Sequence, residues 1–116
     1  MRHRDTRKKF GRVAGPRAAM IRSLATSLIL TEKITTTEAK AKAVRPLVER
    51  LVTRGKENIL VTRRYIMSHL QSEKAVLKVL NELGVRYKAR KGGYLRVTKL
   101  LPRKGDGAKL ARVEFV

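Results

Sequence analysis

The chain contains no cysteine and no tryptophan, and only nine of its 116 residues are acidic. Without cysteine the protein forms neither a disulfide framework nor a thiolate metal site, which suits a reducing compartment. No apolar run approaches the roughly 18–20 residues that span a bilayer. The charged N-terminus is not followed by the apolar core of a secretory signal, so we expect a cytoplasmic protein.

The scarcity of acids leaves a formal net charge of +20, and this charge is unevenly distributed. Residues 1–22 hold eight Lys or Arg residues and one acid, while residues 86–105 hold eight and no acid. The residues between them carry only five more bases than acids. Clustered like charges repel one another, so the pattern favours a polyanionic partner, and the obvious polyanion is nucleic acid.

Apolar residues spaced three and four apart predict about four helices. These helices cover approximately residues 16–30, 38–54, 58–70 and a segment that begins after Ser72. Pro16 suits the first position of a helix, and Thr35 with Glu38 has the spacing of a capping box for the second one. Pro46 lies inside that second helix and predicts a kink or a restart. Gly84 is expected to end the fourth helix in the left-handed conformation.

Three short strands complete the expected fold. The β-branched run Ile34–Thr37 favours a strand, and two alternating segments, 94–101 and 109–116, predict a hairpin around a glycine-containing loop. At 116 residues with 42% hydrophobic content, the chain is long enough for one compact domain. We therefore expect an α+β domain over residues 16–116, with about four helices packed on a sheet of about three strands. Residues 1–15 are expected to form a basic extension that is disordered when free and ordered on its partner.

Catalytic and metal chemistry find little support in the residues. The two histidines, His3 and His69, have no serine or acid partner at a spacing that the sequence supports, and we expect His69 to be structural. Most glutamates in the middle of the chain have a Lys or Arg within one helical turn, as surface ion pairs do. We therefore expect no enzyme, no catalytic residue, no metal, no cofactor and no small-molecule substrate.

Two further motifs have simpler interpretations. The third and fourth helices have the look of a DNA-binding helix-turn-helix, but Lys74 and Lys78 of the would-be recognition helix are balanced by Glu73 and Glu82. Packed helices therefore explain this pair better. The glycine pairs at 92–93 and 105–107 lead into strands rather than into a helix, so we interpret them as turns, although glycine also permits close approach of an RNA phosphate.

The basic segment 86–105 also contains Tyr87 and Tyr94. These rings could stack on unpaired bases or on ribose, and core packing is an equally good interpretation at this point. An extended basic segment combined with a basic hairpin gives two separated contacts. Such an arrangement suits a large folded RNA better than a straight duplex.

Five stretches also resemble, in order and in register, the bacterial family of large-subunit ribosomal protein seventeen. They are Met1–Arg4, Leu24–Leu28, Ile34–Thr37 with Lys40–Lys42 and Arg45–Pro46, Arg90–Arg96, and Gly105–Ala108. The resemblance covers essentially the whole chain. It implies an α+β protein that binds large-subunit ribosomal RNA as a scaffold near the exit of the polypeptide tunnel, beside neighbouring ribosomal proteins. The alternative is a free nucleic-acid-binding regulatory module that acts outside the ribosome.

Charge clustering and the resemblance together give the expected RNA contacts. The resemblance implies RNA contacts by the N-terminal cations, by the segment Thr36–Lys42 and by Arg90–Arg96. The other expected contacts come from the clustering of charge in the two basic segments. The expected RNA-binding residues are Arg2, His3, Arg4, Arg7, Lys8, Lys9, Arg12, Arg17, Arg22, Thr36, Thr37, Lys40, Lys42, Arg86, Lys88, Arg90, Lys91, Gly92, Gly93, Tyr94, Arg96, Lys99, Arg103 and Lys104. Asp5 and the stretch 11–16 depart from the family pattern, and from the latter we expect backbone rather than side-chain contacts.

Overall fold

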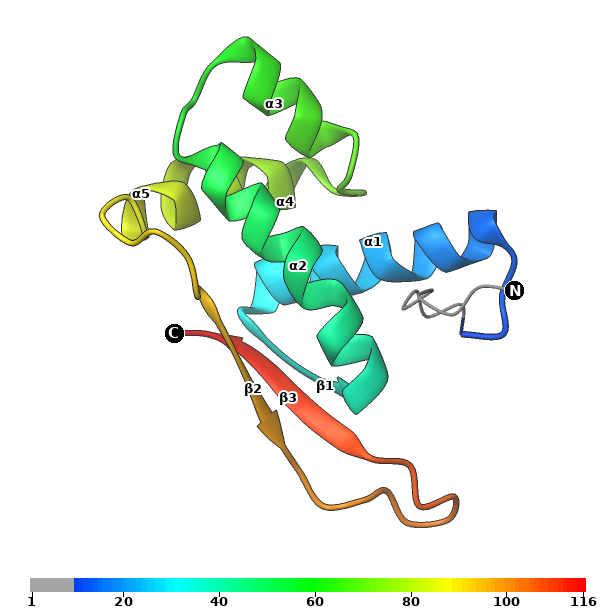
Figure 1. The fold of residues 1–116 in the computed structure, drawn as a ribbon. Helices are drawn as coiled ribbons and strands as arrows, with labels where there is room; N and C mark the ends of the chain where they lie inside the picture. Colours follow the sequence, from blue (N-terminus) through cyan, green and yellow to red (C-terminus); the bar gives the residue numbers. More distant parts are fainter. Residues whose placement is uncertain (1–9) are drawn as a thin grey trace, which may run out of the picture.

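The computed structural model of the chain describes residues 10–116 and has an α+β architecture, as predicted (Figure 1). The predictions for Arg2, His3, Arg4, Arg7, Lys8 and Lys9 lie outside these described residues. In chain order the elements are α1 (Ala14–Thr31), β1 (Lys33–Thr37), α2 (Glu38–Gly55), α3 (Leu60–Met67), α4 (Glu73–Lys78), a π-helical turn (Val79–Leu83), α5 (Gly84–Arg86), β2 (Leu95–Lys99) and β3 (Leu110–Phe115).

The sheet is antiparallel with the strand order β1-β3-β2, so the last strand of the chain is the central one. Val113 of β3 pairs with Ile34 on one side and with Val97 on the other. Residues alternate between the two faces of a strand, and the fully buried Ala111 and Val113 mark the face that packs on the core. Helix α2 contacts all three strands and covers this face (Figure 1). The predicted short strand and hairpin are therefore confirmed.

Helix α2 begins directly at the end of β1. Its N-cap is Thr37, whose hydroxyl accepts a hydrogen bond from the Lys40 backbone N–H at 3.4 Å. The cap is thus a threonine of the run 35–37, but the capping-box spacing of Thr35 and Glu38 is not used, because Thr35 is still within β1 and pairs with Arg112. The helix continues through Pro46, which lies on its exposed side, and remains a single element.

Helix α1 begins at Ala14, two residues before the predicted start at Pro16. Pro16 fits within the first turn, because backbone N–H groups there have no partner inside the helix. Ala25, Leu28 and Ile29 near the C-terminal end are fully buried. The N-terminal half is mostly exposed and extends beyond the other helices (Figure 1).

The path after α3 differs from the predicted one. Helix α3 is shorter than the expected 58–70, and Ile59, the residue just before it, is exposed. The prediction of a left-handed Gly84 that ends the fourth helix was also wrong. Gly84 has a right-handed φ of −61°, and the helical path runs from α4 through the π-helical turn into α5. Glycine is needed there for close packing against Gly55, not for its backbone conformation.

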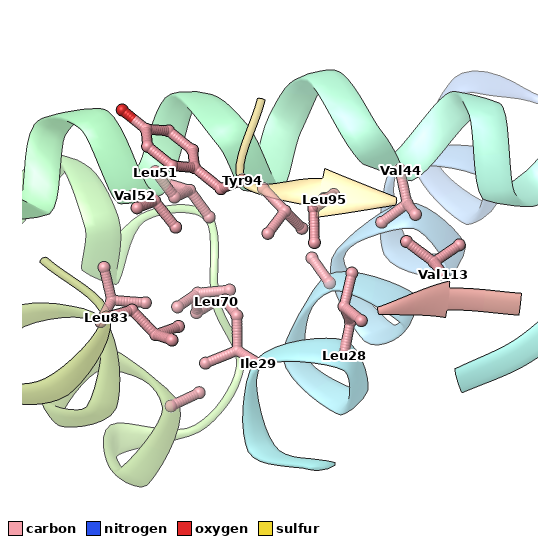
Figure 2. Close-up of a cluster of buried hydrophobic side chains, with 14 of the residues drawn as sticks. Leu28, Ile29, Val44, Leu51, Val52, Leu70, Leu83, Tyr94, Leu95 and Val113 are labelled. Carbon is pink, nitrogen blue, oxygen red and sulfur yellow. The ribbon is translucent and has the colours of Figure 1, made fainter. Parts of the chain in front are cut away.

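The core lies between the sheet, α2, the C-terminal half of α1 and the α4–α5 segment (Figure 2). Its largest fully buried side chains are Leu28, Ile29, Val44, Val48, Leu51, Val52, Ile66, Val79, Leu83, Tyr94 and Val113. The Tyr94 ring lies along α2 beside Leu51 and Val52 (Figure 2). Within residues 10–116, no helix is both long enough and apolar enough to cross a membrane.

Candidate nucleic-acid interface

The start of α2 and the β2–β3 hairpin meet at one end of the molecule. The backbone N–H of Glu38 donates to the carbonyl of Lys109 at 2.9 Å, which joins the first residue of α2 to the start of β3. This contact brings the segment Thr36–Lys42 close to Lys99 at the end of β2. We call this region the hairpin end, and it consists of Thr36, Thr37, Lys40, Lys42, Lys99, Arg103, Lys104 and Lys109.

The hairpin end keeps an excess of positive charge. The Glu38 carboxylate lies 2.9 Å from the Lys42 ammonium and 3.8 Å from that of Lys99. The hydrogen bond from Lys42 is the main reason why the pKa of Glu38 is lowered. Among the described residues, Lys104 and Lys109 have no carboxylate oxygen within 4.0 Å of their ammonium groups. The Glu38 carboxylate therefore contacts two lysines, and the ammonium groups of Lys104 and Lys109 remain available.

Arg103 stabilises the hairpin loop. Its guanidinium donates to both carboxylate oxygens of Asp106, at 3.1 and 2.6 Å. These bonds, with a third from the Ala108 backbone N–H, lower the pKa of Asp106 to about 2. The predicted RNA contact Arg103 is therefore paired within its own loop, and the neighbouring Lys104 is the loop's more available cation.

A second basic region lies at the opposite end of β2. We call it the turn end, and it consists of Arg86, Lys88, Arg90, Lys91, Gly92 and Gly93. The Arg90 Nε donates to the Gly92 carbonyl at 3.2 Å, Gly92 lies in a bend, and Gly93 has a φ of +62°, so these glycines redirect the backbone before β2. The side chains of Lys88 and Lys91 are exposed. In this part of the described chain they have no carboxylate within 4.0 Å.

Arg86 belongs to an ion-pair cluster that stabilises the fold. Its guanidinium lies 2.5 Å from the Glu32 carboxylate, and the Lys78 ammonium lies 3.1 Å from the other oxygen of the same group. The hydrogen bond from Arg86 is the largest cause of the lowered pKa of Glu32, which is about 2. Glu32 ends α1 in the left-handed conformation, with a φ of 65°. Arg86 therefore contributes to the connection between α1 and α5.

The two tyrosines of the basic segment are core residues. Tyr94 is fully buried and Tyr87 is 5% exposed, and their ring centroids lie 5.1 Å apart. The Tyr87 hydroxyl donates to the Val116 carbonyl at 2.7 Å, while the Tyr94 hydroxyl lies 3.1 Å from that of Thr53. Of the two interpretations, core packing is confirmed and stacking on bases is wrong. The Tyr94 side chain therefore leaves the set of expected RNA contacts.

The face of the sheet turned away from α2 carries cations that the sequence did not single out. Arg112 and Glu114 alternate with the buried Ala111 and Val113, so they point to this opposite face. Arg112 lies in register between Thr35 and Thr98, and its buried Nε has no hydrogen-bond partner among residues 10–116. The alternation of apolar and polar residues along 109–116 indicated a second face for this strand, but only the strand order shows that three strands contribute to it.

Arg96 also points to this opposite face, because it pairs in register with Glu114. Its guanidinium lies 3.7 Å from the Glu114 carboxylate, and its side chain remains 59% exposed. Lys33 faces the same carboxylate from β1 and was likewise missed. The predicted contact Arg96 is therefore accessible, though partly neutralised.

The cations of α1 form a third region. Arg12, Arg17 and Arg22 lie at or near the N-terminal half of α1, on the side of the molecule away from the turn end (Figure 1). A guanidinium nitrogen of Arg17 donates to the carbonyl of Arg12 at 3.3 Å. The predicted residues thus gather in separate regions and do not form one continuous patch.

The remaining candidates show local packing. The His69 Nδ1 lies 2.9 Å from the Tyr65 carbonyl and 3.0 Å from the Ser68 hydroxyl, and its ring packs on that of Tyr65. Helix α4, the would-be recognition helix, has only six residues, and its Lys78 contacts Glu32. Across residues 10–116, no three His, Cys, Asp or Glu side chains are grouped so as to hold a metal ion.

Comparison with known proteins gives consistent matches. Residues 20–116 match the model of a family described as ribosomal protein L17. The chain is 51% identical to a protein of Hydrogenobaculum sp. (strain Y04AAS1), with 100% of this chain and 99% of the relative covered. It is 47% identical to a protein of Thermomicrobium roseum at the same coverage, and 49% identical to one of Salinibacter ruber, of which it spans 59%. All three relatives are named large ribosomal subunit protein bL17.

Proposed function

The chain belongs to the ribosomal protein L17 family, and from this membership we propose that it is a structural constituent of the large ribosomal subunit. In this role it binds large-subunit ribosomal RNA and contacts neighbouring ribosomal proteins in the cytoplasmic ribosome. Its proposed position is near the exit of the polypeptide tunnel. It holds RNA segments in place and carries out no chemical reaction.

The observation that carries this proposal is the separation of the basic regions on one folded domain. The hairpin end and the turn end lie at opposite ends of β2, and the cations of α1 lie apart from both (Figure 1). Each region can neutralise phosphates of a different RNA segment. Three separated basic regions fit a folded RNA, in which several segments converge, better than a single straight helix.

The basic residues divide into two roles. Arg86, Arg103 and Lys42 form close ion pairs, at 2.5–2.9 Å, and shape the protein surface, whereas Arg96 and Lys99 lie farther from a carboxylate, at 3.7 and 3.8 Å. We propose that the more available cations make the direct phosphate contacts. This second set consists of Arg12, Arg17, Arg22, Lys40, Lys88, Arg90, Lys91, Arg96, Lys99 and Lys104, with Lys109 and Arg112 added by the structure.

We also propose that residues 1–15 act as a basic RNA-binding extension of the domain that follows. The sequence supports this role, because this segment has many cations and one acid. Since α1 already begins at Ala14, the last residues of the extension continue directly into the first helix.

The alternative function is a free regulatory module that binds nucleic acid outside the ribosome. If such a module bound DNA, the helix pair α3 and α4 would be its helix-turn-helix, with α4 in the major groove. Helix α4 has only six residues, and one of its two lysines, Lys78, is paired with Glu32, so that version has little support. Binding to isolated RNA alone does not separate the two functions, and sedimentation with the ribosome does.

The RNA-binding part of the proposal is tested with purified protein and large-subunit ribosomal RNA. The apparent affinity should fall steeply with salt, by roughly 10³–10⁵ between 50 and 200 mM if six to ten phosphates are contacted. Small-subunit ribosomal RNA is the matched competitor. Equal affinity for both RNAs would contradict specific recognition of the large subunit.

A further inference from the structure

Leu101 is an exposed apolar side chain in the loop of a basic hairpin. It lies at the start of the loop between β2 and β3 and is 87% exposed, more than any other large apolar side chain in residues 10–116. The loop extends away from the helices, at the bottom of Figure 1. An isolated exposed leucine is ordinary on a protein surface, so its surroundings decide whether it has a role.

The loop that carries Leu101 is internally hydrogen-bonded. The backbone N–H of Leu100 donates to the Leu110 carbonyl at 2.9 Å, and that of Arg103 donates to the Ala108 carbonyl at the same distance. The ion pair between Arg103 and Asp106 closes the tip. These contacts fix the backbone before any partner binds, which lowers the entropy cost of binding.

The charge around Leu101 favours RNA as its partner. Lys99 is the last residue of β2, Lys104 and Lys109 belong to the loop itself, and the acids Asp106 and Glu38 are already paired with Arg103 and with lysines. A protein partner would have to supply both an apolar site and several acids. RNA supplies phosphates together with the apolar faces of unpaired bases and of ribose.

We propose that Leu101 is an RNA-contacting residue that packs against an unpaired base or a ribose of large-subunit ribosomal RNA. Lys104 and its neighbouring lysines bind the adjacent phosphates. Apolar side chains such as leucine are known to insert between base steps of bent DNA, and the same contact is available where RNA bases are unstacked. The inference rests on the proposed function and adds a specific, uncharged contact to it.

The test separates an apolar contact from a charge contact. Leu101→Ala should weaken binding to large-subunit ribosomal RNA by roughly ten-fold, since most of a buried leucine contact is lost. It should leave the slope of log affinity against log salt unchanged, because no phosphate contact is removed. Lys104→Ala should lower both the affinity and the slope, the latter by about 0.7–0.9.

Leu60→Ala is the matched control, since Leu60 is 60% exposed on α3, outside the hairpin. Leu101→Phe should retain binding, because the apolar contact is kept. Equal binding of Leu101→Ala and the wild type would overturn the inference. If the wild type itself fails to bind the RNA, the proposed function fails instead.

A photoreactive diazirine analogue of leucine in place of Leu101 identifies the contact directly. In assembled large subunits it should crosslink to ribosomal RNA. Crosslinks to a ribosomal protein alone would overturn the inference and assign the hairpin tip to a protein neighbour.

Discussion

Gly55 and Gly84 pack backbone against backbone where the end of α2 meets the start of α5. A Cβ atom on Gly84 would lie 2.7 Å from the carbonyl carbon of Gly55 and closer still to its oxygen. It would also lie 3.0 Å from the carbonyl oxygen of Val79 in the π-helical turn. Since these neighbours are backbone atoms, they cannot move aside as a flexible side chain can.

Gly84→Ala should therefore destabilise the protein by about 2–3 kcal/mol, through overpacking at a backbone contact. The measurement is chemical denaturation followed by circular dichroism. The control is Gly15→Ala in the first turn of α1, where an added Cβ meets no atom within 4 Å. That change should be neutral or stabilising by up to about 1 kcal/mol. Similar losses for the two variants would show that the close contact is not the cause.

These two glycines also show what the sequence could not reveal. The helix over 38–54 and the hairpin were predictable, because each follows from spacing along a short segment. The contact between Gly55 and Gly84 joins segments that are distant in the sequence, and no local sequence pattern predicts it. A glycine near the end of a helical stretch usually forms a left-handed cap, and the prediction for Gly84 followed this rule. In the structure, tertiary packing against Gly55 is the reason for a glycine at this position.

The candidate interface was predictable in composition but not in the role of each residue. Charge alone could not separate Lys104, which is available, from Arg103, which is paired with Asp106. The spacing of Arg103 and Asp106 in the loop could have indicated that pair. Burial of Tyr94 depends on its packing against α2, and the sequence left that alternative open.

The stability of the protein should depend on Glu32 at acidic pH. The folded protein lowers the pKa of Glu32 from 4.5 to about 2, mainly through the hydrogen bond from Arg86. The unfolded chain therefore takes up the proton first as the pH falls. The stability that the ionised Glu32 gives the folded protein is therefore complete above pH 4.5 and is lost between pH 4.5 and about 2.

Glu32→Gln should be less stable than the wild type at pH 6, and the difference should shrink as the pH approaches 2. Thermal denaturation across this pH range measures the effect. Glu82→Gln is the control, because Glu82 has no Lys or Arg nitrogen within 4.0 Å in the part of the chain described. A difference between Glu32→Gln and the wild type that stays constant from pH 6 to 2 would contradict the role of this ion pair.

Neutralising available cations at both ends of β2 should weaken RNA binding. The triple variant Lys88→Gln, Lys91→Gln and Lys104→Gln removes three proposed phosphate contacts. The salt slope should fall by roughly 2–3, and affinity near 100 mM salt should fall by roughly a hundred-fold or more. Filter binding to large-subunit ribosomal RNA measures both values.

The control for this variant is an equal loss of charge elsewhere. The control variant combines Arg63→Gln, Arg64→Gln and Lys74→Gln. These three residues lie on α3 and α4, outside the proposed basic regions. This triple variant should lose less than roughly ten-fold in affinity, through the change in net charge alone. If the two triple variants lose the same affinity, binding depends on total charge and not on the regions assigned here.

Removing residues 1–9 should weaken RNA binding while the helical circular dichroism signal remains. This segment carries five Lys or Arg residues and one acid, and the first helix of residues 10–116 begins at Ala14. A full-length variant with these five cations changed to Gln separates the effect of charge from that of length. Loss of the helical signal on truncation would mean that the segment is needed for folding.

A structural role in the large ribosomal subunit requires that this protein stay bound to that subunit. Sedimentation of the tagged, full-length protein from its native cells through a sucrose gradient at moderate salt tests this requirement. The protein should sediment with the large subunit and with intact ribosomes, and not with the small subunit. A protein that stays at the top of the gradient, away from the large subunit, would contradict the proposed role.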